Sequence, residues 1–76
     1  MDKQEERGFL MHISERIKRA RELAGLNLSE LSRRLDVDRS TVSKWESGKQ
    51  EPRGYEVCSD IAKICGVSLV EFWGWE

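Results

Sequence analysis

One stretch, residues 28–48, constrains the fold of this chain more than any other part of the sequence. Its first half has leucines at steps of three and four, which place them on one face of a helix: Leu28, Leu31 and Leu35. A polar turn at residues 36–38 interrupts this pattern, and a second helical pattern follows. The stretch therefore predicts two short helices, 28–35 and 39–47, joined by a tight turn.

The second of these helices has two unlike faces. Val42 and Trp45 are three residues apart and share its inner side. The outer side carries hydrogen-bonding groups, namely Arg39, Ser40, Ser43 and Lys44. This combination is typical of a helix that packs on a core and enters a groove of nucleic acid. For Trp45 the alternative is an exposed platform on which a base stacks, but a core position is favoured because the residue follows an apolar one by three.

The pattern resembles the helix-turn-helix of phage repressors and Cro proteins, the XRE-type transcriptional regulators. The matching residues are Leu31, Val37, Ser40, Thr41, Val42, Ser43, Trp45, Glu46 and Gly48, and the resemblance spans about residues 13–72. Three positions depart from the family pattern: Leu28 replaces the usual Gln, Ser32 the usual Ala, and Asp36 the usual Gly. Asp36 still suits the turn, since aspartate adopts the left-handed conformation at modest cost.

The resemblance implies an all-α, five-helix, lambda-repressor-like DNA-binding domain. It also implies that the protein binds a double-stranded DNA operator as a homodimer and regulates transcription as a repressor. The base contacts carried over from the family are Arg39, Ser40 and Lys44, with Thr41 and Ser43 as secondary candidates. The candidate phosphate contacts are Asn27, Ser47, Lys49 and Arg53. For Arg39 and Lys44, the alternative role is to keep an exposed helix soluble.

An ion pair is a further implication of the resemblance. The family pairs the arginine that corresponds to Arg21 with the glutamate that corresponds to Glu46, which would join the first helix to the third. The alternative is two solvated charges that do not interact. Arg21, Glu46, Val42 and Trp45 are therefore expected to have structural roles.

Periodicity and capping residues predict the remaining helices. The first runs from Phe9 or Leu10 to Ala24, and Gly25 ends it. It has one apolar stripe, and Arg16, Lys18 and Arg19 lie on faces other than this stripe. Asn27 and Glu30 form a capping box for the second helix, and Asp38 caps the third. The fourth runs from Tyr55 or Glu56 to Cys65, and Ser68 with Glu71 caps a short fifth helix. Residues 1–8 are expected to be a flexible charged lead-in, and 9–76 the DNA-binding domain.

The C-terminal end is more apolar than one face of a short helix can bury. Exposed apolar patches usually have a partner, so this end predicts a dimer interface formed by Leu69, Val70, Trp73 and Trp75. The alternative function is a protein-interaction module, such as an antitoxin or a regulatory partner, that uses the same aromatic end.

Composition limits the other possible functions. Residues 16–53 have 10 Lys and Arg against 6 Asp and Glu, a balance of +4, whereas the remaining residues have 3 against 8, or −5. This basic middle is compatible with a phosphate-binding face. The spacing of Cys58 and Cys65 fits neither an internal disulfide nor a zinc site. We expect no enzyme activity, cofactor, metal or small-molecule ligand. With no membrane span or signal peptide in the sequence, we expect a cytoplasmic protein.

Overall fold

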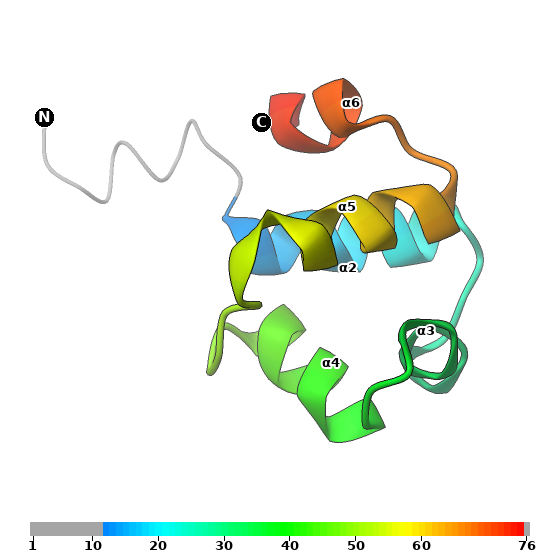
Figure 1. The fold of residues 1–76 in the computed structure, drawn as a ribbon, viewed down its shortest axis with the longest axis vertical. Coiled ribbons are helices and arrows are strands. Elements are labelled where there is room, and N and C mark those ends of the chain that lie inside the picture. The colour runs from blue at the N-terminus through cyan, green and yellow to red at the C-terminus, as the bar shows by residue number, and fades with distance from the viewer. Residues whose placement is uncertain (1–11, 76) are drawn as a thin grey trace, which may run out of the picture.

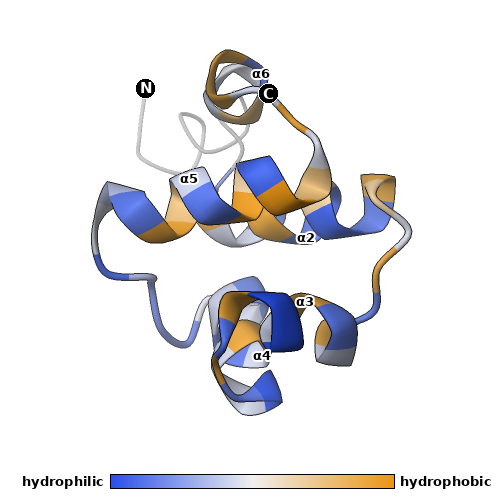
Figure 2. Ribbon diagram, turned by 45° about the vertical axis from the view of Figure 1, so that its right-hand side comes forward, coloured by the Kyte–Doolittle hydropathy of each residue, from blue (hydrophilic) through white to orange (hydrophobic). Residues whose placement is uncertain are grey.

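The computed structural model describes residues 12–75, and the helices of this part of the chain lie on two sides of a central pair. Helices α2 (Ile13–Leu23) and α5 (Gly54–Cys65) cross the middle of the molecule. Helices α3 (Leu28–Leu35) and α4 (Arg39–Ser47) lie on one side of this pair, and α6 (Leu69–Gly74) lies on the other (Figures 1 and 2). The predicted all-α fold with five helices is therefore confirmed for the described residues.

Each helix contributes one large side chain that is fully buried in a common core. These side chains are Ile17, Leu31, Val42, Ile61 and Phe72, in chain order. Apolar residues on the helices face this core, while hydrophilic residues cover the outside (Figure 2). Because every helix has an anchor in the same cluster, the position of each one depends on the others.

Helix α2 begins later than the sequence predicted. His12 has an extended backbone, with ψ at 153°, so a helix cannot run through it from Phe9 or Leu10. The imidazole Nδ1 of His12 accepts a hydrogen bond from the Ser14 N–H at 3.2 Å, which satisfies one of the free donors at the helix start. The predicted lead-in, residues 1–8, and the predicted first helical residues lie outside the described part. At the other end, Gly25 follows the helix with a φ of 71°.

The helix-turn-helix has the predicted bounds. The side chain of Asn27 accepts from the Glu30 N–H at 2.8 Å, and the Asn27 N–H donates to the Glu30 carboxylate at 2.9 Å, which completes the capping box of α3. Asp36 adopts the left-handed conformation with a φ of 59°, as the turn requires. Asp38 is the N-cap residue of α4 as predicted, although its side chain makes no capping hydrogen bond.

The last two helices follow the sequence closely. Helix α5 begins at Gly54, one residue before the earliest predicted start. Its buried residues are Cys58, Ile61, Ala62 and Cys65, and both cysteines are free thiols. The Ser68 hydroxyl accepts from the Glu71 N–H at 3.0 Å at the start of α6, which is one half of the predicted capping box. No helix within residues 12–75 combines the length and the apolar character that crossing a bilayer requires.

The sequence predicted Arg16 on an outer face of α2, and this prediction is wrong. Only 6% of its surface is exposed, and its Nη1 donates to the Phe72 carbonyl at 2.7 Å. The reason is tertiary, since α6 covers the part of α2 on which Arg16 lies.

Candidate nucleic-acid interface

Two apolar side chains fix the rotation of α4 about its own axis. Val42 and Trp45 are buried, so the predicted core position of Trp45 is confirmed and its alternative as an exposed stacking platform is excluded. Both belong to the cluster that contains Leu31 of α3. With these residues inward, the opposite side of α4 must face solvent.

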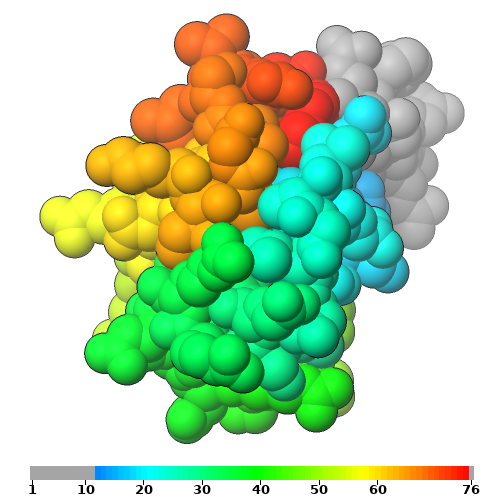
Figure 3. Space-filling model, turned by 90° about the vertical axis from the view of Figure 1, so that its right-hand side faces the viewer, coloured from blue at the N-terminus to red at the C-terminus, as the bar shows by residue number. Residues whose placement is uncertain are grey.

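Polar side chains occupy that opposite side. The exposed ones are Arg39, Ser40, Ser43 and Lys44, and Thr41 is half-buried beside them. In Figure 3 the green atoms of α3 and α4 form one end of the molecule, opposite the orange and red atoms of α6. The face is therefore free of contacts with α6 and has the donors that base edges accept.

A bidentate ion pair joins α2 to α4. The Nε of Arg21 donates to Oε2 of Glu46 at 2.7 Å, and Nη2 donates to Oε1 at 2.9 Å. Nη1 donates to the Leu26 carbonyl at 2.9 Å, so the same guanidinium also holds the loop before α3. The hydrogen bond with Glu46 raises the pKa of Arg21 above its ordinary value, which favours the charged guanidinium. The pair predicted from the sequence is thus present.

Two adjoining hollows, which share Leu28 and Arg39, lie between the start of α3 and the start of α4. The first is also lined by Arg21, Asn27 and Ser29. The second is also lined by Ser40 and Ser43. Sequence reasoning missed Leu28 as a member of this face, because it placed Leu28 on the apolar face of its helix and otherwise noted it as a departure from the family pattern. The one available signal was that a leucine stands where the family has a polar residue, and the structure shows this leucine to be half-buried.

The candidate phosphate contacts lie at both ends of α4. Asn27 is exposed beside Arg39, with its side-chain oxygen occupied by the α3 cap. Ser47 ends α4, and its hydroxyl donates to the Lys44 carbonyl at 3.2 Å. Lys49 and Arg53 are exposed in the segment after the helix. These residues therefore flank the polar face of α4 rather than forming one cluster.

The C-terminal residues divide into an exposed set and a packed one. Val70 is 87% exposed and Trp73 is 42% exposed, with Leu69 beside them. Trp75 instead is half-buried, and its ring lies 5.7 Å from that of Phe72, so it is less available to a partner than the sequence predicted. Tyr55 of α5 is 81% exposed and its ring stands edge-on to Trp73 at 6.3 Å. Sequence reasoning did not include Tyr55, because only the fold brings it to Trp73.

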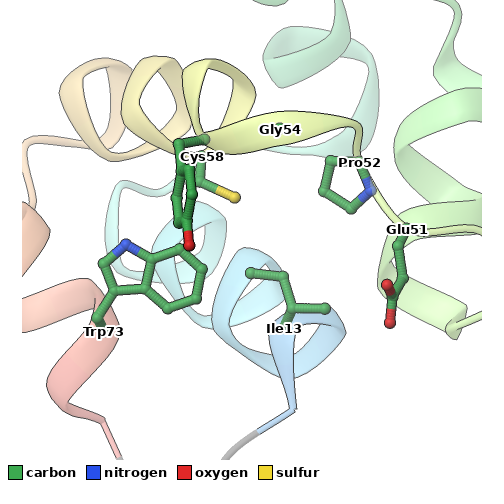
Figure 4. Close-up of a pocket in the computed structure, with 7 residues that line it drawn as sticks. Ile13, Glu51, Pro52, Gly54, Cys58 and Trp73 are labelled. Carbon is green, nitrogen blue, oxygen red and sulfur yellow. The ribbon is translucent and has the colours of Figure 1, made fainter.

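A small pocket adjoins this aromatic pair. Its lining comes from the start of α2, the α4–α5 segment, the start of α5 and α6: Ile13, Glu51, Pro52, Gly54, Tyr55, Cys58 and Trp73 (Figure 4). Burial raises the pKa of the Cys58 thiol and also that of Cys65. Within residues 12–75, no three His, Cys, Asp or Glu side chains gather where a metal ion could bind.

Comparison with known proteins gives one match. A family model described as helix-turn-helix covers residues 17–72, which is more than half of the chain. No curated protein and no solved structure matches the sequence. The matched range begins at Ile17 and ends at Phe72, two of the core anchors, so it includes the whole helix-turn-helix, all of α5 and the greater part of α2 and α6.

Proposed function

The chain belongs to the XRE-type helix-turn-helix family of DNA-binding regulators, and from this we propose that it binds a specific operator as a homodimer and represses transcription. The observation that carries the proposal is the two-faced character of α4. Its apolar residues are buried with the core, and Arg39, Ser40, Ser43 and Lys44 are exposed at one end of the molecule. Burial on one side and donors on the other are what a recognition helix requires.

The chemistry of the exposed face suggests how it reads a sequence. Arg39 and Lys44 carry donors that match the O6 and N7 acceptors of guanine, and Ser40 bonds with several bases. Thr41 and Ser43 supply further hydroxyl groups, and the Thr41 methyl suits the methyl group of thymine. A helix of nine residues is about 13 Å long, close to the ~12 Å width of the major groove.

Flanking groups are proposed to hold the backbone. Lys49 and Arg53 follow α4, and Asn27 lies near its start. We expect them to contact phosphates on both sides of the groove. Such contacts fix the register of the helix in the groove and supply affinity, but they do not select a sequence.

The position of α6 restricts how a dimer can form. Helices α4 and α6 lie on opposite sides of the α2–α5 pair (Figure 1). A dimer joined end to end through α6 would point its two α4 helices away from each other, and only one would meet a given duplex. We therefore propose that the copies meet along the side where Tyr55 and Trp73 lie, together with Leu69 and Val70.

Selection of bound duplexes from a random pool tests this function. The parent protein is expected to enrich an inverted repeat whose half-sites are centred about 34 Å apart, one turn of duplex. The exposed polar side of α4 is the proposed reading face. The matched control is Arg33→Ala, which removes an exposed cation of α3 outside this face. No enrichment above the random pool would contradict the proposal, and single half-sites without a repeat would contradict the dimer.

A second function is a protein-interaction module that acts through the exposed aromatic side. The exposure of Val70 and Tyr55 favours it, since both are large apolar residues in solvent. The ionic-strength dependence of binding separates the two functions. DNA binding must weaken steeply with salt through counterion release, whereas binding through apolar side chains is not weakened in this way.

A further inference from the structure

Helix α6 is short and has one fully buried anchor, so something else must fix its orientation. It has six residues, of which only Phe72 is buried. A helix this short is not stable by itself. Its last carbonyls also lack partners within the helix and need donors from elsewhere.

Arg16 supplies one such donor from within the core. Its Nη1 donates to the Phe72 carbonyl at 2.7 Å, across 56 positions of sequence. A cation at this end of a helix is also favoured by the helix dipole. The guanidinium carbon of Arg16 lies 5.8 Å from the centre of the Trp73 ring, within the range of a cation–π contact.

Arg19, one turn further along α2, contacts the next tryptophan. Its guanidinium carbon lies 5.1 Å from the centre of the Trp75 ring. Arg16 and Arg19 are three residues apart and share one side of α2. Trp73 and Trp75 lie on either side of Gly74 at the end of α6. Each of the two arginines therefore contacts a different indole.

We propose that Arg16 and Arg19 form a clamp that fixes α6 and thereby sets the direction in which Trp73 is presented to a second copy of this chain. Because the clamp holds the carbonyl of Phe72 and one indole on each side of Gly74, it leaves α6 little freedom to turn. The link to assembly rests on the dimer proposed above, whereas the link to α6 does not.

The surroundings of Trp73 show why its direction matters. Its ring meets that of Phe72 at 5.2 Å and that of Tyr55 at 6.3 Å, edge-on in both cases. Figure 4 shows its indole extending from α6 towards Cys58 and Ile13, where it forms one side of the pocket. A turn of α6 would break the contact with Tyr55 and so divide the aromatic surface in two.

Amide hydrogen exchange of the full chain tests the clamp. The variants are Arg16→Met, Arg19→Met and the double variant, which keep most of the side-chain length but remove the charge and the donors. Lys18→Met is the matched control, since it removes an exposed cation of α2 that lies between the two arginines. We expect the amides of residues 71–74 to exchange at least tenfold faster in the double variant, while those of α3 and α4 change less than twofold.

The outcomes separate the clamp from a general loss of stability. Equal protection of α6 in the double variant and the parent would overturn the proposal, as would faster exchange spread evenly over all helices. If Arg16→Met does not fold, Arg19→Met decides the question, because Arg19 is exposed. The single variant is then expected to show a smaller but detectable increase in the exchange rate, confined to the amides of α6. An unchanged exchange rate of α6 would overturn the clamp.

Sedimentation of the same variants tests the consequence for assembly. Loosening of α6 is expected to weaken dimerisation at least tenfold, while binding to a single half-site stays as in Lys18→Met. A loosened α6 with unchanged dimerisation would overturn the link to assembly. A parent that stays monomeric would contradict the proposed dimer instead, and the exchange experiment would still decide whether the clamp exists.

Discussion

Arg21 and Glu46 join the first described helix to the proposed recognition helix through two parallel hydrogen bonds, of 2.7 and 2.9 Å. Both side chains are largely buried, with 14% and 9% of their surfaces exposed. The removal of Glu46 therefore leaves the Arg21 guanidinium largely buried with the Leu26 carbonyl but without its opposing charge, which is far more costly than the loss of a surface pair. The pair holds the C-terminal end of α4, whereas Val42 anchors its first half.

Glu46→Ala is accordingly expected to lower the free energy of unfolding by about 3 kcal/mol. Urea denaturation followed by circular dichroism measures this change. Glu22→Ala is the control, because Glu22 is an exposed carboxylate on α2, and a surface substitution of this kind changes stability by less than ~0.5 kcal/mol. An equally small effect for Glu46→Ala would show that the pair contributes little in solution.

Local patterns explain why the sequence predicted α3 and α4 with correct bounds. The Asn27–Glu30 capping box and the left-handed Asp36 are formed by residues close together in the chain. Arg16 could not be placed in this way, because its partner is the Phe72 carbonyl, 56 positions away. The same holds for Tyr55 and Trp73, which only the packing of α6 on α5 brings together.

The reading face is predicted to lose its sequence preference when its cations are removed. Arg39→Ala and Lys44→Ala should each cost about 1–3 kcal/mol on the selected operator, since each removes donors to a base edge. Binding to random duplexes should change much less, and the thermal midpoint should stay near that of the parent because both residues are exposed. Unchanged affinity for the selected operator in the double variant would contradict the assignment of α4.

Substitution of the proposed phosphate contacts should lower the affinity for DNA without changing the preference for the operator. Lys49→Ala and Arg53→Ala are expected to lower the affinity for operator and for random duplexes by similar factors, because phosphates are common to both. Each should also reduce the slope of log affinity against log salt concentration by about 1. A titration at several salt concentrations measures this, with Lys63→Ala on α5 as the control. A loss confined to the operator would mean that these residues contact bases instead.

Asp36→Gly is predicted to stabilise the fold. Asp36 has a φ of 59°, a conformation that costs L-residues free energy and that glycine adopts without strain. Since glycine also loses more entropy on folding, the net gain should be about 0.5 kcal/mol. Asp36→Ala is the matched control and should destabilise, because alanine keeps the Cβ without the local hydrogen bonding of aspartate. Equal stability of these two variants would show that backbone strain at this turn is negligible.

Stability is predicted to fall at alkaline pH because of the two buried thiols. Burial raises the pKa of Cys58 and of Cys65 above the ordinary value, so the unfolded chain loses these protons first. The stability is fully present below the unfolded pKa of about 8.5 and is lost as the pH rises above it. The free energy of unfolding is therefore expected to fall between pH 7.5 and 9.5. Urea denaturation under reducing conditions measures it, and a Cys58→Ala, Cys65→Ala variant should lose less over the same range. Parallel curves for the parent and this variant would mean that other groups cause the alkaline loss.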